Sequence, residues 1–309
     1  MSADLRQIAG EYLAVRRSLG FRLERAGRLL GQFLDHLDAT GQTHISSEAA
    51  LAWASLPGGG PGSNWPGQRL SVVRGLARWA HSHDPGHELI APDLLPTRVR
   101  RANPYLYSPE DVAALIAATQ TLRTPLRQAT YATLVGLLSV TGMRLSEVIN
   151  LDRADIDPQA DTLLIRNTKF GKTRQVITHP STLAALTDYQ RLRDLTCPAT
   201  ATPALLVSTA GTRLLPGNVG WTFRRLVGVA GLESRGTARP RIHDLRHSFA
   251  VNAMRDAYAD GQDGQSRLAL ICTWLGHVHP KDTYWYLSAS PELMASAGDR
   301  LEQALGGRA

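Results

Sequence analysis

Long apolar runs, cysteines and lysines are all scarce in this sequence. The amino-terminal stretch carries Asp4 and Glu11 among its apolar residues, which predicts neither a signal peptide nor a membrane span. The two cysteines, Cys197 and Cys272, form no CxxC or metal-ligand pattern, so we interpret them as ordinary small hydrophobic residues in a reducing compartment. These features favour a cytoplasmic protein over a secreted, membrane or disulfide-stabilised one.

Arginine supplies nearly all of the basic residues. Of 34 Lys and Arg residues only three are lysines, Lys169, Lys172 and Lys281, and the first two share the stretch NTKFGKTR. Arginine keeps its proton at accessible pH whereas lysine can release it, so a site that needs a proton donor cannot exchange one for the other. The lysine pair is a candidate proton-donating loop, with chance clustering in a solvated turn as the alternative. The net charge of +7 favours a polyanionic partner.

Residues 1–96 are predicted to form a helical, basic domain. Apolar residues recur at helical spacing over 3–39, with Gly20 between two helices, and another helix follows the loop at 56–67. Its arginines read equally well as phosphate contacts or as a solvated face; the candidate DNA contacts are Arg16, Arg17, Arg22 and Arg74. A proline-rich stretch then predicts an extended basic linker over 97–103, with Arg98, Arg100 and Arg101 as further candidates.

The second domain, predicted over 104–309, is expected to be mainly helical with a small β-hairpin. Ser108 and Pro109 predict the N-cap and first residue of a helix. A buried helix is expected over 126–142 and a short one over 145–151. The β-prone runs at 163–165 and 175–178 flank the lysine-bearing turn and predict the hairpin. Further helices are expected at about 181–195, 217–229, 243–258 and 265–275.

Four segments place polar groups in apolar surroundings: TGMRLSEV, the lysine hairpin, HDLRH and LGHVHPKDTYWYL. His243, Arg246 and His247 stand at helical spacing and share a face. A buried arginine is costly unless it is paired, so Arg144 needs an anion, and Glu147 supplies one in the purely structural interpretation. Together the segments suit phosphodiester chemistry, in which guanidiniums bind the phosphate, a tyrosine attacks it with help from an imidazole, and a lysine protonates the leaving oxygen.

TGMRLSE, a hairpin lysine, HDLRHSFA, LGH and a tyrosine nine positions after that histidine together resemble the tyrosine recombinase, or phage integrase, family over about residues 104–290. The resemblance implies a C-shaped DNA clamp made of a helical, SAM-like core-DNA-binding domain and an integrase-type catalytic domain. It implies a cytoplasmic, nucleoid-associated site-specific recombinase that works through a 3′-phosphotyrosyl intermediate and a Holliday junction. Its partners would be double-stranded DNA with paired core sites and other subunits of a homo- or hetero-tetramer, with no metal or other cofactor.

The resemblance also implies roles for single residues. The implied catalytic set is Arg144, Lys169, His243, Arg246, His277 and Tyr286. Lys172 is the alternative to Lys169 as general acid and a further DNA contact, and Tyr284 is the alternative nucleophile. Glu147 would steady the first arginine. His247, which shares the helix face, is expected to support the helix or to pack near the phosphate. The tail after residue 290 has amphipathic spacing and is expected to dock on a neighbouring subunit or to pack on its own domain.

Three other interpretations use parts of the same pattern. His243 and His247 also match the spacing of a zinc-protease helix, with Asp244 where a glutamate belongs, but that reading leaves Arg144 and Tyr286 without a purpose. A DNA-binding subunit that has lost catalysis would keep the basic charge. A type IB topoisomerase would use similar residues to relax DNA without exchanging strands. Integration, excision, transposition and dimer resolution are all open as the biological role.

Overall fold

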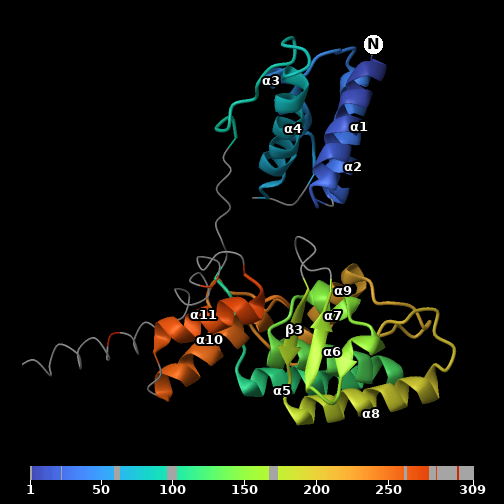
Figure 1. The fold of residues 1–309 in the computed structure, drawn as a ribbon, viewed down its shortest axis with the longest axis vertical. Coiled ribbons are helices and arrows are strands. Elements are labelled where there is room, and N and C mark those ends of the chain that lie inside the picture. The colour runs from blue at the N-terminus through green and yellow to red at the C-terminus, as the bar shows by residue number, and fades with distance from the viewer. Residues whose placement is uncertain are drawn as a thin grey trace, which may run out of the picture. The chain divides into compact units, whose positions relative to one another are not determined.

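A computed structural model of the chain describes residues 2–21, 23–58, 63–95, 103–166, 173–260, 263–277, 283 and 298. The chain divides into two units, residues 1–101 and residues 102–309, and each is described by itself (Figure 1). Among the described residues, no helix has both the length and the apolar character needed to cross a membrane.

The described residues of the first unit form four helices: α1 Ser2–Ser18, α2 Glu24–Ala39, α3 Ser47–Ser55 and α4 Trp65–His81. Helix α2 shows the expected amphipathic pattern, because Leu30, Phe33 and Leu37 lie on one face and are buried. The predicted helices are confirmed, whereas α3 was not anticipated. Its nine residues are largely alanine and give a weak periodic signal, so its start depends on the Ser46 hydroxyl, which accepts a hydrogen bond from the Ala49 N–H.

The described residues of the second unit form these α-helices: α5 Pro109–Ala118, α6 Pro125–Thr141, α7 Leu145–Asn150, α8 Pro180–Thr196, α9 Pro216–Val229, α10 Asp244–Ala259 and α11 Gly264–Leu275. The predicted start of α5 is confirmed, since Ser108 and Asp111 form a reciprocal capping box and Pro109 is the first helical residue. Helix α6 is buried as predicted and contacts α5, α8 and α10, so it forms the centre of the core.

The small sheet is antiparallel, with the strand order β1 Ile156–Asp157, β2 Thr162–Ile165 and β3 Arg174–Ile177. In the β2–β3 hairpin Leu163 pairs with Val176 and both are buried, whereas the neighbouring Gln175 is exposed. This confirms the hairpin and adds one short strand to it. The turn that carries Lys169 and Lys172, residues 167–172, lies outside the described residues.

Candidate active site

Two helices of the second unit, α6 and α11, end in glycines that turn the chain into the candidate site. Gly142 and Gly276 adopt left-handed conformations, with φ of 62° and 65°. A Cβ atom on Gly142 would lie 2.4 Å from a ring carbon of Phe249, so this turn requires glycine for both its backbone conformation and its packing. The chain then reaches Arg144 after α6 and His277 after α11.

Arg246, in the first turns of α10, joins the ends of these two helices. Its side chain is buried, with a relative exposure of 1%. Its Nη1 donates to the Gly142 carbonyl at 2.7 Å and its Nη2 to the Leu275 carbonyl at 2.6 Å. Both acceptors are neutral carbonyls at the negative ends of helix dipoles, so they orient the guanidinium without cancelling its full charge.

His277 lies directly against this guanidinium, with its Nε2 2.9 Å from Arg246 Nη2. A guanidinium only donates hydrogen bonds, so Nε2 accepts and the ring proton is assigned to Nδ1. Nδ1 faces the Thr283 hydroxyl at 2.6 Å, and that buried hydroxyl also lies 3.0 Å from Cys272 Sγ. These contacts fix the orientation of the imidazole, and Thr283 lies three positions before Tyr286 in the sequence.

Arg144 and Glu147 form the expected pair at the start of α7. Glu147 accepts from the Arg144 side chain at Oε1, 2.8 Å from Nη1, and from the Arg144 backbone N–H at Oε2, also 2.8 Å away. A second guanidinium, that of Arg174 at the start of β3, donates to the same two oxygens at 3.0 and 2.9 Å. Sequence analysis missed Arg174, although it lies only two positions beyond Lys172.

The two arginines determine the charge of this cluster. Burial alone would raise the pKa of Glu147, but the hydrogen bonds from Arg174 and Arg144 outweigh burial and lower the pKa to about 2. Two guanidiniums and one carboxylate leave one net positive charge. The Arg144 side chain is 28% exposed, and its Nη2 lies 3.5 Å from the Gly276 carbonyl, so it remains open to a ligand beside Arg246 and His277.

The histidines of α10 lie beside the same arginines and tend to be neutral. The rings of His243 and His247 meet edge to face, with centroids 5.1 Å apart. His243 retains an exposed surface, yet desolvation by its surroundings lowers its pKa, and the positive charge of Arg246 adds to the shift. His247 is buried, and burial followed by the nearby His243 and Arg241 lowers its pKa to about 3. Neutral imidazoles can accept protons or hydrogen bonds.

Asp244 is not arranged like the glutamate of a zinc-protease helix. It is fully buried and accepts hydrogen bonds from Arg241 Nε at 2.9 Å and Nη2 at 2.8 Å. His247 Nε2 is 3.9 Å from one of its oxygens. The carboxylate therefore serves as the partner of Arg241 rather than as a free general base. Among the described residues, no group of three or more His, Cys, Asp or Glu side chains could hold a metal ion.

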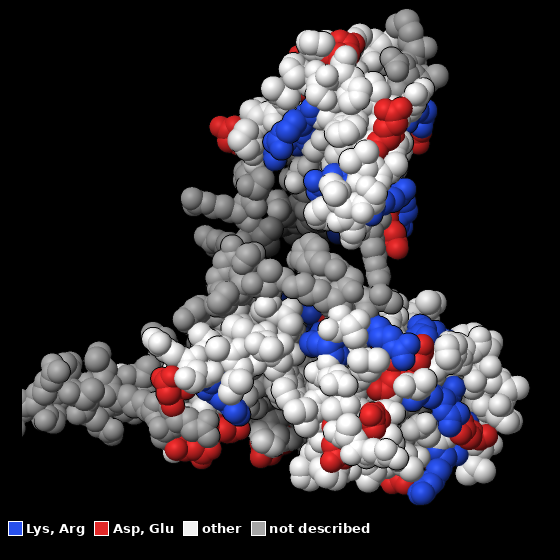
Figure 2. All heavy atoms as spheres, viewed as in Figure 1, with Lys and Arg blue, Asp and Glu red and all other residues white. Residues whose placement is uncertain are grey.

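Several predicted residues lie outside the described ones, namely Arg22, Arg98, Arg100, Arg101, Lys169, Lys172, Tyr284 and Tyr286. In the first unit, Arg17 is exposed and Arg16 stacks on the Phe21 ring at 4.2 Å. Arg74 donates to the carbonyl of Ala91 at 3.0 Å and so has a structural contact as well. The basic side chains coloured in Figure 2 are all arginines, and on the face shown they are interspersed with acidic residues in both units.

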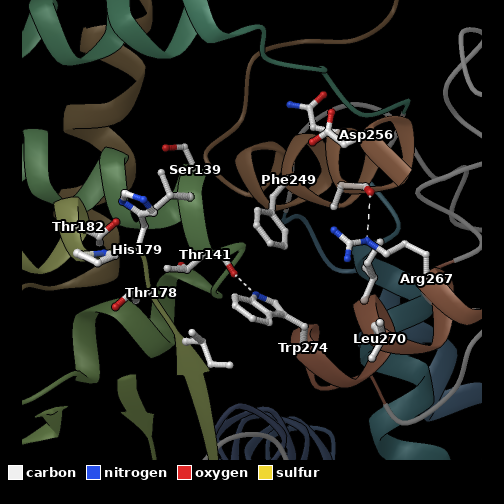
Figure 3. A pocket seen from close by; sticks show the side chains of 16 residues that line it. Ser139, Thr141, Thr178, His179, Thr182, Phe249, Asp256, Arg267, Leu270 and Trp274 are labelled. Atoms are coloured by element: carbon white, nitrogen blue, oxygen red, sulfur yellow. Dashed lines mark hydrogen bonds between the residues drawn. The ribbon is translucent and has the colours of Figure 1, made fainter. Parts of the chain in front are cut away.

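A mostly apolar groove of about 620 Å³ is lined by residues of α6, α10 and α11 and of the segment 177–182. Figure 3 shows Phe249 of α10 and Trp274 of α11 pointing into it, with their rings stacked at 6.1 Å. The Trp274 indole N–H donates to the Thr141 carbonyl at 2.8 Å, which fixes the tryptophan against the end of α6 (Figure 3). Three exposed apolar side chains also line the groove: Val140, Ile177 and Leu270. The groove thus lies beside the ends of α6 and α11, the two helix ends that also carry the candidate site.

Comparison with known proteins identifies relatives of the whole chain. The sequence pattern of the phage integrase family matches residues 106–292. The protein named "Putative integrase/recombinase y4rB" of Sinorhizobium fredii (strain NBRC 101917 / NGR234) is 45% identical over 308 residues, covering 97% of this chain and 98% of the relative. Tyrosine recombinase XerC of Mesorhizobium japonicum is 30% identical over 267 residues, covering 82% of this chain and 80% of the relative.

Two solved structures share the fold. The XerH site-specific recombinase bound to palindromic difH substrate has a TM-score of 0.65 and 18% identity, over 99% of this chain and 84% of that one. The Tn1549 transposon integrase in complex with transposon right end DNA has a TM-score of 0.65 and 16% identity, over 97% of this chain and 98% of that one. The mainly helical fold with a small sheet is therefore common to all three chains.

Proposed function

The chain belongs to the phage integrase family and is a tyrosine-type site-specific recombinase, and from this premise we propose how its residues cleave and rejoin DNA. The observation that carries the proposal is the meeting of Arg144, Arg246 and His277 at the ends of α6 and α11. Three segments distant in sequence thus supply two guanidiniums and an imidazole to one place. A scissile phosphate is the ligand that this combination of donors fits best.

In the proposed reaction Arg144 and Arg246 hold the nonbridging oxygens of one phosphate and stabilise the additional charge of the transition state. The Tyr286 hydroxyl attacks phosphorus, and its proton passes to a neutral imidazole, for which His243 is the better placed candidate because its pKa is lowered and its ring is exposed. The bond from phosphorus to the 5′ oxygen breaks, and Lys169, or Lys172 as the alternative, gives that oxygen a proton.

The resulting 3′-phosphotyrosyl link keeps the strand end activated. The free 5′ hydroxyl of a partner strand attacks it, the tyrosine leaves, and a Holliday junction forms. A second pair of cleavages then yields recombinant strands. Every step is an exchange of one phosphodiester for another, so the balance of bonds needs neither a nucleotide nor an oxidant.

Strand exchange between two duplexes requires several subunits. We propose that the first unit is the core-binding domain and that it closes with the catalytic domain around DNA, through the basic linker, as a clamp. Two protomers would bind each core site and four would form the working assembly in the cytoplasm. The tail after residue 290 would dock in the apolar groove of a neighbouring subunit, which the exposed Val140, Ile177 and Leu270 side chains support.

The nucleophile assignment is tested in two steps. The cleaved phosphates are first mapped on DNA flanking the gene. A synthetic duplex is then made that has a nick close to one of these phosphates. Loss of the short nicked fragment prevents religation and traps the covalent adduct. Wild-type protein and Tyr284→Phe should form the adduct, whereas Tyr286→Phe should bind the duplex with unchanged affinity and form none. An adduct on Tyr286→Phe would overturn the assignment, and the mapped sites would identify which exchange the enzyme performs.

A further inference from the structure

Arg174 makes three hydrogen bonds that the proposed reaction does not use. Its Nε donates to the Trp274 carbonyl at 3.0 Å, and its two terminal nitrogens hold both oxygens of Glu147. The side chain is 15% exposed. One guanidinium thus connects β3 to the start of α7 and to the last turn of α11. Arg144 lies at the start of α7, and His277 follows the end of α11.

We propose that Arg174 is a positioning residue that fixes β3, Arg144 and the end of α11 relative to one another, an inference that rests on the function proposed above. Arg174 is the first residue of β3, where it pairs with Ile165 of β2. Its guanidinium reaches Glu147, which orients Arg144, and the Trp274 carbonyl near the end of α11. The guanidinium therefore links the β2–β3 hairpin to the residues proposed to bind phosphate.

The Glu147 carboxylate shows why a second guanidinium is needed. Each of its two oxygens accepts one hydrogen bond from Arg144 and one from Arg174. With Arg144 alone, the pair would be neutral, and Arg144 would attract the phosphodiester monoanion and its dianionic transition state less strongly. Arg174 restores the positive charge while Glu147 still orients Arg144. The carboxylate thus acts as a support between the two guanidiniums and does not neutralise the pocket.

The end of α11 is shaped to admit this side chain. Gly276 has no side chain, and a Cβ atom there would lie 3.3 Å from Arg174 Nη1 and 3.5 Å from its Cζ. The glycine therefore serves both its left-handed backbone and the close approach of Arg174. Arg174 also donates to the main-chain carbonyl of Trp274, so it is held both by a side chain, that of Glu147, and by the main chain.

The test measures adduct formation in single-turnover conditions on the nicked duplex described above, across pH. Arg174→Gln should keep its affinity for the duplex and cleave about 10²-fold more slowly, because misplaced catalytic groups cost this much even when the chemistry is intact. Arg174→Lys keeps the positive charge but lacks the bidentate fork, so its cleavage rate should lie between those of wild type and Arg174→Gln. Arg213→Gln is the matched control: Arg213 also joins a carboxylate, that of Asp152, to a main-chain carbonyl, that of Ile149, at the C-terminal end of α7.

The pH profile separates positioning from general loss of stability. The Glu147 carboxylate is contacted by Arg144 at the start of α7 and by Arg174 of β3. Without Arg174, only Arg144 would oppose the effect of burial, so the pKa of Glu147 should rise. As the pH is lowered, the cleavage rate of Arg174→Gln should therefore begin to decline at a higher pH than the wild-type rate. Glu147→Gln should abolish that difference, and in a Glu147→Gln background the Arg174 substitution should have little further effect.

The inference would be overturned if Arg174→Gln cleaved DNA as fast as Arg213→Gln. It would also be overturned if Arg174→Gln cleaved more slowly but its rate had the same pH dependence as the wild-type rate. If Arg174→Gln does not fold, Arg174→Lys carries the same test, since it keeps the charge. Failure of the proposed function gives a different result, namely no adduct with wild-type protein or an adduct that persists in Tyr286→Phe.

Discussion

At the scale of single residues, burial determines the protonation state of the site histidines. His247 lies inside α10, surrounded by Arg241, Arg246 and His243, and its pKa falls to about 3. An imidazole with an ordinary pKa near 6.5 would be partly charged in the cell and would repel the arginines beside it. The buried neutral ring thus adds no positive charge that would repel the guanidiniums of the site.

This arrangement predicts how stability depends on pH. Between pH 6.5 and about 3 the unfolded chain binds a proton at His247 and the folded protein does not, so the free energy of unfolding should fall as pH falls through this window. The largest slope from one such group is about 1.4 kcal/mol per pH unit. His247→Gln should lose less stability than wild type between pH 7 and pH 5, as measured by urea unfolding.

His243 shifts in the same direction, so the variant should retain part of the slope. Glu147 contributes at lower pH, because a carboxyl with a depressed pKa loses its stabilisation only as pH falls below about 4 towards 2. Equal losses of stability in wild type and His247→Gln between pH 7 and pH 5 would contradict the assignment of a neutral His247.

At the scale of elements, local signals in the sequence predict most of the helices and the hairpin. Ser108 and Pro109 mark the start of α5 because a hydroxyl cap and a fixed backbone angle act within one turn. Arg174 could not be recognised in this way. Its partners Glu147 and Trp274 are 27 and 100 positions away, and a strand position gives no hint of which distant carboxylate or carbonyl it meets. Motif order predicts that Arg144, Arg246 and His277 belong together, but not that carbonyls at two helix ends hold them.

The groove between α6, α10 and α11 allows a prediction about assembly. Leu270 lines it and is 62% exposed, so Leu270→Glu should leave the fold intact, with a stability change within about 0.5 kcal/mol. A charge in the groove should weaken docking of a neighbour's apolar tail and reduce the mass of the complex on DNA, measured by sedimentation. Leu195→Glu is the control, since Leu195 is 82% exposed on α8 and does not line the groove. Tetramers formed by Leu270→Glu at wild-type protein concentrations would exclude this groove as the docking site.

At the scale of the whole molecule, charge alone does not locate the site. Arginines are dispersed over both units and mixed with acidic residues on the face shown in Figure 2. What distinguishes the site is that its arginines converge. Arg246, held by carbonyls at the ends of α6 and α11, lies beside Arg144, which shares one carboxylate with Arg174. In the proposed function these guanidiniums meet the scissile phosphate and stabilise its negative charge.

The most direct test of that claim compares two substrates that differ in the charge of the scissile phosphate. Arg144→Ala is the suitable variant, because Arg174 continues to pair with Glu147. On natural DNA its single-turnover cleavage rate should fall by roughly 10² to 10³, as for the loss of one donor to a transition-state oxygen. On DNA with a neutral methylphosphonate at the scissile position, the difference from wild type should shrink to less than about tenfold, because the arginine has less negative charge to stabilise. An equal penalty on both substrates would contradict the account, since Arg144 would then act on something other than the phosphate.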